Sequence, residues 1–411
     1  MKIGRFSKMG HVSVDTVRHY IDLGLVVPEK IGAHFEFDEL CSKDLAHVLQ
    51  LKDMGFQLKE IQRIFAMIRL GAATPKSEVT YIIEEFQERI RAIESEENVL
   101  AMRKNTIHAK LEELKALTFK ESVEIGVSLN QLSLLACRKC KSSYVPIDAH
   151  IQKSYIIEGQ LGCNCGTILE VKRGIVVGDT FFKKPSSKMD LNMQEAYEDY
   201  VKSTDQDFLD ELYKSMDWIK KKINNRENGG SNLLELGVGS GMFLRHFIND
   251  LNQQDVYIAV DHDYERLLSL KAMLEANGVE KKLLLICSDF LSMPLIENVA
   301  DIVLDLSGSV HYAFDHNEPL LPLISPWVKS ETFVMGAYIV FDHLYKNEDD
   351  SIRCEQVFNV NGIKDIYAKS RIEIIEDSLS PVISGGGKYE EMYQVGKNMR
   401  AYRSYGVYKE I

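Results

Sequence analysis

The chain has 411 residues, enough for two or three domains, and its 45% hydrophobic and 27% charged residues are an ordinary globular composition. The formal net charge of -12 excludes a general nucleic-acid coat, although a local DNA-reading surface is compatible with an acidic whole. No apolar run reaches membrane-spanning length and the first residues lack a signal-peptide core, so we expect a cytoplasmic protein with no membrane partner.

Residues 1–75 are expected to form a first domain of short helices separated by turns. Ser13 stands where its hydroxyl can accept the backbone N–H of Thr16 and so begin a helix. The apolar residues that we expect on the buried side of this helix are Val14, Val17 and Ile21. A helix, a turn and a second capped helix with polar faces are typical of a helix-turn-helix.

Two stretches of this region resemble the MerR family of winged-helix transcription regulators. They are residues 17–28 (Val-Arg-His-Tyr-Ile-Asp-Leu-Gly-Leu-Val-Val-Pro) and residues 51–61 (Leu-Lys-Asp-Met-Gly-Phe-Gln-Leu-Lys-Glu-Ile). In that family the second helix enters the major groove and a following wing holds the phosphate backbone. The resemblance implies double-stranded promoter DNA as a partner. The residues that would then face DNA are Ser13, Thr16, Arg18, His19 and Tyr20.

The expected wing departs from the family's pattern. Where that family usually carries a Tyr-Arg-x-Tyr-like run, this chain has Phe35-Glu36-Phe37. The Glu36 carboxylate would stand where a guanidinium normally meets phosphate, and like charges repel, so DNA affinity should fall. Residues 1–70 hold ten Lys/Arg against nine Asp/Glu, a small basic excess. The module is therefore either a DNA-binding domain or a retained fold that no longer binds DNA.

Residues 79–115 contain no Pro or Gly and predict one helix of about 55 Å, at 1.5 Å per residue. Its apolar residues follow alternating steps of three and four, as in a coiled-coil heptad, with Glu97 and Lys104 at two seam positions. The apolar seam residues are Ile83, Phe86, Ile90, Ile93, Leu100, Ile107, Leu111 and Leu114. In MerR-like proteins the corresponding helix pairs antiparallel with a second subunit. We therefore expect a homodimer through residues 79–115, the alternative being a helix packed on its own chain.

Four of the seven cysteines form two close pairs, Cys137 with Cys140 and Cys163 with Cys165. Zinc favours four soft ligands in a tetrahedron, and two pairs on two turns supply them. The alternative is four reduced surface cysteines, favoured by the C-x-C spacing of the second pair. Residues 159–177 resemble the small zinc-ribbon family of Trm112-like proteins, which bind or are fused to methyltransferases. Because four thiolates leave no open position on zinc, we assign the site to stability and docking rather than catalysis.

Residues 232–243 (Asn-Leu-Leu-Glu-Leu-Gly-Val-Gly-Ser-Gly-Met-Phe) predict a strand, a glycine-rich turn and a helix start, the opening of a doubly wound sheet. A dinucleotide-binding turn has glycine at 237, 239 and 242, but position 242 is Met. Gly241 instead completes E-x-G-x-G-x-G, which resembles motif I of class I methyltransferases. The resemblance covers about 180 residues and implies S-adenosylmethionine as the cofactor. Its methionine part would lie against Glu235, Gly237, Gly239 and Gly241.

Three more apolar strands, residues 256–260, 283–287 and 301–304, end in polar residues. Asp261 can accept hydrogen bonds from the ribose hydroxyls, Asp289 can accept from the adenine amino group, and Phe290 can pack on the adenine ring. Any one of these acids alone is equally typical of a helix cap or a solvated turn. Together they predict one cofactor site, because ligands of such sheets bind at the carboxyl ends of the strands.

The methyl acceptor is expected to be a small molecule. The segment after the fourth strand, Asp305-Leu-Ser-Gly-Ser309, lacks the Asn/Asp-Pro-Pro-Tyr run of amino-directed nucleic-acid methyltransferases, and Cys287 lies within a strand. His311 is the candidate general base, since a histidine there can take a proton as methyl is transferred. A strong base is not required, because transfer from a sulfonium depends chiefly on in-line positioning.

The complete prediction is a multidomain α/β protein. Its parts are a winged helix-turn-helix (1–75), a dimerisation helix (76–117), a zinc ribbon (118–180), a helical lead or lid (181–228) and a Rossmann-like class I methyltransferase domain (229–411). Residues 370–375 and 403–409 should close the sheet as an antiparallel pair. Three functions remain open. They are a regulator with a working small-molecule methyltransferase, a regulator that only senses S-adenosylmethionine or a related ligand, and a methyltransferase whose winged helix only dimerises.

Overall fold

The computed structural model describes residues 1–32, 34–71, 74–118, 120–178, 193–226, 229–345, 352–390 and 395–410. The chain divides into two compact units, Met1–Thr118 and Phe119–Ile411. In the described residues no helix is both long enough and apolar enough to cross a membrane.

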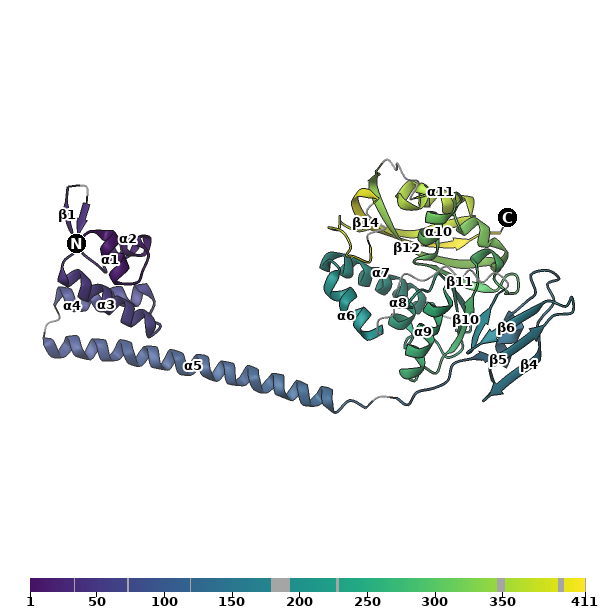
Figure 1. The fold of residues 1–411 in the computed structure, drawn as a ribbon, viewed down its shortest axis with the longest axis horizontal. Helices are drawn as coiled ribbons and strands as arrows, with labels where there is room; N and C mark the ends of the chain where they lie inside the picture. Colours follow the sequence, from purple (N-terminus) through teal and green to yellow (C-terminus); the bar gives the residue numbers. More distant parts are fainter. Residues whose placement is uncertain are drawn as a thin grey trace. The chain divides into compact units, whose positions relative to one another are not determined.

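Unit 1 is a small helical domain followed by one long helix (Figure 1). Its helices are α1 (Ile3–Met9), α2 (Val14–Asp22), α3 (Glu39–Asp53), α4 (Leu58–Leu70) and α5 (Pro75–Lys115), and its strands are β1 (Glu29–Ile31) and β2 (His34–Glu36). The two strands pair antiparallel and form the wing. The predicted cap of α2 is confirmed, because the Ser13 hydroxyl accepts the Thr16 N–H at 3.0 Å. Asp38 caps α3 through the N–H of Cys41 at 2.8 Å.

The core of unit 1 collects apolar side chains from the four short helices. Phe6, Val17, Leu45 and Ile61, one from each helix, are at most 2% exposed. The long helix α5 adds only the partly buried Ile82 and Phe86 to this core. None of the 41 residues of α5 is fully buried, and among the described residues Phe86 is the one seam residue that packs against a core.

Unit 2 is built on a twelve-stranded sheet, counted over its described residues. Its strands are β3 (Val127–Ser128), β4 (Val145–Gln152), β5 (Tyr155–Gly162), β6 (Ile168–Lys172), β7 (Ile175–Val177), β8 (Asn232–Leu236), β9 (Val256–Asp261), β10 (Lys282–Cys287), β11 (Ala300–Asp305), β12 (Val328–Leu344), β13 (Ile372–Leu379) and β14 (Gly396–Tyr408). Its α-helices are α6 (Met193–Ser203), α7 (Gln206–Asn224), α8 (Met242–Phe247), α9 (Tyr264–Ala276), α10 (Gly308–Asp315) and α11 (Val360–Lys369). Its short 3-10 helices are η1 (Leu129–Leu134), η2 (Phe290–Ser292), η3 (Leu321–Trp327) and η4 (Glu355–Phe358).

Seven strands of this sheet have the order β10-β9-β8-β11-β12-β14-β13. All neighbours from β10 to β12 are parallel, and β14 runs antiparallel to both β12 and β13. The predicted antiparallel pair at the C-terminus is therefore confirmed. This topology is the predicted class I methyltransferase fold. The strand order reverses direction at β8, the place where doubly wound sheets bind ligands.

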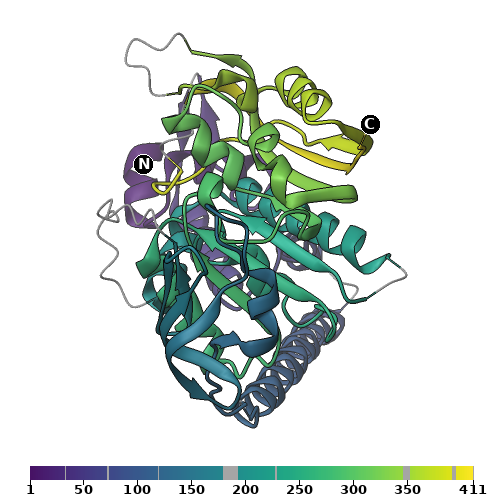
Figure 2. The same ribbon diagram turned by 90° about the vertical axis from the view of Figure 1, so that its right-hand side faces the viewer.

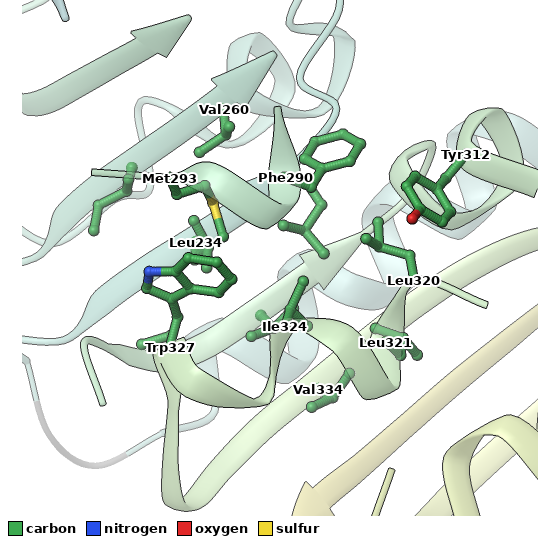
Figure 3. Packing of buried hydrophobic residues seen from close by; sticks show 14 of the residues in the cluster. Leu234, Val260, Phe290, Met293, Tyr312, Leu320, Leu321, Ile324, Trp327 and Val334 are labelled. Atoms are coloured by element: carbon green, nitrogen blue, oxygen red, sulfur yellow. The ribbon is translucent and has the colours of Figure 1, made fainter. Parts of the chain in front are cut away.

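Helices cover both faces of the sheet, because alternate residues of each strand point to opposite layers. Leu233 of β8 packs with side chains of α7, α8 and α9. Its neighbour Leu234 packs on the other face with residues of α10 and η3. Figure 3 shows this second layer, where Leu234 and Val260 lie close to Met293 and Trp327.

The strands next to the two cysteine turns continue the same sheet. β7 pairs in parallel with β10, with Val176 opposite Ile286, and β6, β5 and β4 follow antiparallel. In Figure 2 these blue-green strands lie at one end of unit 2, and the yellow β13–β14 pair lies at the other. The region expected to form the zinc ribbon thus shares a sheet and a core with the methyltransferase fold.

Candidate cofactor, metal and DNA-binding sites

The glycine-rich turn between β8 and α8 has three left-handed residues, Gly237 (φ 73°), Gly239 (φ 54°) and Gly241 (φ 70°). A side chain at 237 would press on Gly308 at 3.2 Å, and one at 241 would overlap Leu270. At Gly239, in contrast, an added side chain would meet nothing within 4 Å. Two glycines therefore serve packing, and the third leaves backbone that a ligand can approach closely.

Asp261, at the end of β9, holds this turn from the side. One carboxylate oxygen accepts the N–H of Gly239 at 2.7 Å, and the other accepts the N–H of Asp263 at 2.9 Å. The residue is 3% exposed, so its carboxylate is fixed against the turn. A carboxylate has about four acceptor positions, which leaves two for further donors. The structure thus brings Asp261 and the turn together.

Asp289 follows β10, the strand next to β9. Its carboxylate accepts the N–H of Leu291 at 2.7 Å and caps η2. Phe290 is 8% exposed and packs in the core beside the turn, where its ring lies 3.6 Å from the position of an added Gly237 side chain. In Figure 3 its ring points into the same layer as Leu234 and Met293. Asp289 therefore serves as a cap, and any contact of Phe290 with an adenine ring is limited to its exposed edge.

Glu235 lies on β8, two residues before Gly237, and is 3% exposed. Its carboxyl group accepts the hydroxyl proton of Tyr257 at 2.7 Å. Burial raises the pKa of Glu235 to about 8, and the neighbouring charge of Asp261 acts in the same direction. Glu235 is thus largely protonated at neutral pH, and it supports the turn from inside the sheet.

The substitution Glu235→Gln is expected to change how stability depends on pH. The pKa of Glu235 is about 8 in the folded state, above its unfolded value. The folded state therefore holds the extra proton between the two values, and stability falls as pH rises through this window, by up to about 1.4 kcal/mol per unit. Urea unfolding followed by the fluorescence of Trp218 and Trp327, both in unit 2, should give a flatter profile for the variant from pH 5 to 8. The exposed Glu265→Gln should keep the wild-type slope, and an unchanged slope in E235Q would contradict the assignment.

Helix α6 lies against the glycine-rich turn, in the region where the sequence predicted a lid, whereas α7 packs on one face of the sheet. The Tyr197 hydroxyl of α6 donates to Ser240 of the turn at 3.1 Å, and Arg245 stacks on the Tyr197 ring at 4.0 Å. At the start of α7, Asp207 accepts the hydroxyl and N–H of Ser384, in the loop before Gly385. Residues 181–192 of the predicted lid lie outside the described residues.

His311 of α10 lies near the carboxyl ends of β9 and β11. Its side chain is exposed, and desolvation lowers its pKa. Tyr312 is 6% exposed and stacks on His316 with ring centroids 3.7 Å apart. Tyr312 is thereby packed away from solvent, whereas His311 is exposed.

A buried polar network below α10 was not predicted. Asp305 accepts the Ser309 N–H and the Tyr338 hydroxyl proton, both at 2.8 Å, and Tyr338 contacts the Tyr367 hydroxyl at 3.2 Å. Ser404 of β14 donates to Tyr367 at 2.7 Å. Desolvation raises the pKa of Asp305. Asp305 was visible at the strand end, but its partners come from β12, α11 and β14 and meet only in the folded sheet.

The four cysteines form one cluster, as predicted. Their sulfur atoms all lie within 4.8 Å of one another, and those of Cys137 and Cys165 are 3.6 Å apart. Zinc–sulfur bonds are about 2.3 Å long, so a tetrahedral ion fits among sulfurs with such spacing. Although burial opposes it, the N–H groups of Cys140 and Lys139 lower the pKa of Cys137 to about 6. A lowered pKa favours the thiolate, which is the form of cysteine that binds metal.

Four of the five residues predicted to face DNA are at least partly exposed, and the fifth is buried. Arg18 and His19 are exposed, and Arg18 pairs with Asp15 at 2.9 Å. Ser13 and Thr16 lie together at the start of the helix, with their hydroxyls 2.8 Å apart. Tyr20 requires a correction, because it is 5% exposed and packs in the core of the domain with Val17. Its ring supports the helix from within and is not available to contact DNA.

The first domain is also a member of a known family by sequence. Residues 1–68 match the family described as "MerR HTH family regulatory protein". Residues 1–68 are a MerR-type helix-turn-helix domain. No curated protein matches the chain.

Solved structures of methyltransferases show a weak likeness to this chain. A putative sarcosine dimethylglycine methyltransferase from Galdieria sulphuraria has 8% identity and a TM-score of 0.39, over 48% of this chain and 86% of that one. A SAM-dependent methyltransferase from Aquifex aeolicus has 13% identity and a TM-score of 0.34, over 53% and 99%. One from Methanosarcina mazei has 10% identity and a TM-score of 0.35, over 46% and 98%. Likenesses at this level carry no information on activity.

The wing of the MerR-type domain is more acidic than the sequence pattern alone indicated. In the β1–β2 pair, Glu29 lies directly opposite Glu36, and both are exposed. The Glu36 carboxylate lies 3.6 Å from the amino group of Met1, and this ion pair is half exposed. Surface pairs of this kind are worth little, so the wing keeps two carboxylates on one face.

Charge reversal on the wing, Glu36→Arg, is expected to tighten binding to a labelled duplex from the protein's own promoter. It removes a repulsive charge and supplies a phosphate contact, so affinity at low salt should rise about tenfold and depend more steeply on salt. Fluorescence anisotropy over a salt series measures both quantities. Glu280→Arg, on an exposed loop of unit 2, makes the same change in net charge and should have little effect. Equal gains in the two variants would show that the wing does not meet DNA.

Proposed function

We propose that the protein is a MerR-type transcription regulator whose C-terminal fold binds S-adenosylmethionine and uses it to methylate a small molecule. The observation that supports this most strongly is the turn of Gly237, Gly239 and Gly241, fixed by Asp261 at the point where the strand order reverses. Open space at Gly239 suits the close approach of a ligand, and two acceptor positions on Asp261 suit a pair of ribose hydroxyls.

The chain's own residues would act mainly by positioning. Bound S-adenosylmethionine supplies a sulfonium-activated methyl group. The open backbone at Gly239 and the Asp261 carboxylate would hold the ligand, and α6 would exclude water through Tyr197. His311 has a lowered pKa and is neutral at pH 7, so it could accept a proton from a hydroxyl or amine acceptor.

The other parts of the chain would serve regulation and stability. The apolar seam of α5, on a helix with no buried residue, would pair antiparallel with a second copy and set the spacing of two α2 helices on promoter DNA. The four-cysteine cluster would hold zinc as a structural ion, with Cys137 buried in the core that also contains Phe290.

Two measurements test this function. Calorimetry with S-adenosylmethionine on the full chain should show saturable binding, and the absence of binding heat together with no change in thermal stability would reject the cofactor. Incubation with a deproteinised extract of small molecules should accumulate S-adenosylhomocysteine. Binding without this product would instead identify a sensor of the cofactor.

A second candidate is a methyltransferase whose winged helix only dimerises. The opposed carboxylates of Glu29 and Glu36 favour it, because they weaken contact between the wing and phosphate. Absence of a mobility shift with the protein's own promoter at low salt, for a chain that turns over the cofactor, would select this candidate.

A further inference from the structure

The first cysteine pair is joined to the loop that follows β10. Residues 134–136 pair with residues 294–296. The Ala136 N–H donates to Pro294 at 3.1 Å, the Ile296 N–H donates to Leu134 at 2.9 Å, and Leu135 and Leu295 form a bridge. On the far side of the cysteine turn, Lys141 forms an ion pair with Glu297 at 2.7 Å. The turn of Cys137 and Cys140 is therefore built onto residues 294–297.

Arg138, between the two cysteines, reaches further back along this loop. Its guanidinium stacks on the ring of Trp327 at 4.6 Å, and its Nη2 donates to the backbone oxygen of Leu291 at 3.4 Å. Trp327 is 1% exposed. Leu291 belongs to η2, the same short helix that Asp289 caps. Arg138 thus contacts the loop that carries the predicted adenine-side residues.

The loop is otherwise held by apolar packing. Phe290 and Met293 are 8% and 0% exposed, and Figure 3 shows them on the same side of the sheet as Trp327. Leu291, at 37% exposure, faces outward and has no such anchor. Besides the hydrogen bonds of Ser292 to Ser288 and Asp289, η2 is held by its Asp289 cap and by the hydrogen bond from Arg138.

A bound metal ion would restrain the position of Arg138. Coordination fixes the backbone on both sides of it, at Cys137 and Cys140, whereas four free thiols leave this turn without that restraint. A planar guanidinium can stack on an indole and donate in its plane at the same time, which an ammonium group cannot do. Through these two contacts of Arg138, the presence or absence of a metal ion would affect the position of η2.

We propose that Arg138 is a positioning residue that couples the four-cysteine cluster to the loop of residues 289–292, so that metal occupancy sets the affinity for the adenosyl cofactor. The coupling to the cofactor rests on the proposed function above. The coupling of the cluster to the loop does not depend on that function, because it is argued from the contacts of Arg138 with Trp327 and Leu291.

Hydrogen exchange of the full chain tests the coupling without cofactor. Removal of zinc with a chelator, and Arg138→Ala in zinc-loaded protein, should each raise exchange in residues 134–141 and 289–297 and leave β8 and β9 protected. Zinc content of Arg138→Ala should remain at the wild-type level. A rise that spreads equally over β8 and β9 in the stripped protein would overturn the proposal in favour of a metal that only stabilises the fold. The proposal would also be overturned if hydrogen exchange in residues 289–297 changed neither on removal of zinc nor in Arg138→Ala.

Calorimetry with S-adenosylhomocysteine tests the effect on the cofactor site. Arg138→Ala should weaken binding about tenfold, a usual size for coupling between sites. Arg138→Lys keeps the charge and is expected to fold, and it should lose a smaller but measurable part of the affinity. The control Lys139→Ala, at the exposed neighbouring position, should bind as wild type. Wild-type affinity in both Arg138 variants would overturn the proposal. If wild-type protein itself fails to bind, the proposed function fails, and the exchange experiment alone decides the coupling.

Discussion

Asp261→Ala is expected to weaken binding of S-adenosylmethionine by more than about 100-fold. The carboxylate both places the N–H of Gly239 and retains acceptor positions for the ribose hydroxyls. A hydrogen bond to a charged group contributes about 1.5–3 kcal/mol, so the loss of two such bonds exceeds a hundredfold change in affinity. Calorimetry on the full chain at fixed salt measures the change directly.

Two further variants make this result specific. Asp261→Asn keeps one side-chain oxygen for Gly239 and should show an intermediate loss. Asp250→Ala removes a surface carboxylate that pairs with Lys220 and should bind as wild type. Wild-type affinity in a folded Asp261→Ala would exclude the ribose assignment, and with it the cofactor site at this turn.

The second large effect is expected from the double substitution Ile90→Glu and Ile107→Glu on α5. These seam residues are 55% and 62% exposed, which is unusual for isoleucine unless another surface covers them. Buried glutamates would make the seam unstable, so light scattering should report a monomer. Affinity for promoter DNA should fall by more than about 100-fold, because a single MerR-type domain meets one half-site and loses the gain from linked binding.

The matched control places the same charges on the opposite side of α5. Ser95→Glu and Met102→Glu lie roughly half a turn away from the seam at 100° per residue, and both are exposed. This variant should remain dimeric and bind DNA as wild type. A dimer that survives the seam substitutions would show that the two copies associate through another surface.

The strands and their ends could be predicted because both are local features. Strands β8 to β11 are short apolar runs followed by glycine or acidic residues, and their boundaries differ from the predictions by at most one residue. The cap at Ser13 is equally local, since it joins residues three apart. Where the residues that determine an element all lie in one segment, hydrophobic pattern and turn residues are enough to predict that element.

The features that could not be predicted depend on contacts between distant segments. The burial of Tyr20 follows from packing against other helices of the MerR-type domain, and α2 alone presents it as one more polar aromatic residue. The opposition of Glu29 and Glu36 requires the register of the wing. The contact of Arg138 with Trp327 joins residues almost two hundred positions apart, and the spacing of the cysteines does not predict it.

The pairing of β7 with β10 sets the order in which parts of the chain can fold during translation. The MerR-type domain has its own core and can fold as soon as it leaves the ribosome. Val177 ends β7, whereas Lys282 begins its parallel neighbour, so the two cysteine turns and the strands beside them emerge more than a hundred residues before the strand that joins them to the rest of the sheet. Closing so long a loop is slow. The cysteine thiols must therefore stay reduced until β10, which ends at Cys287 of the 411 residues, has been translated.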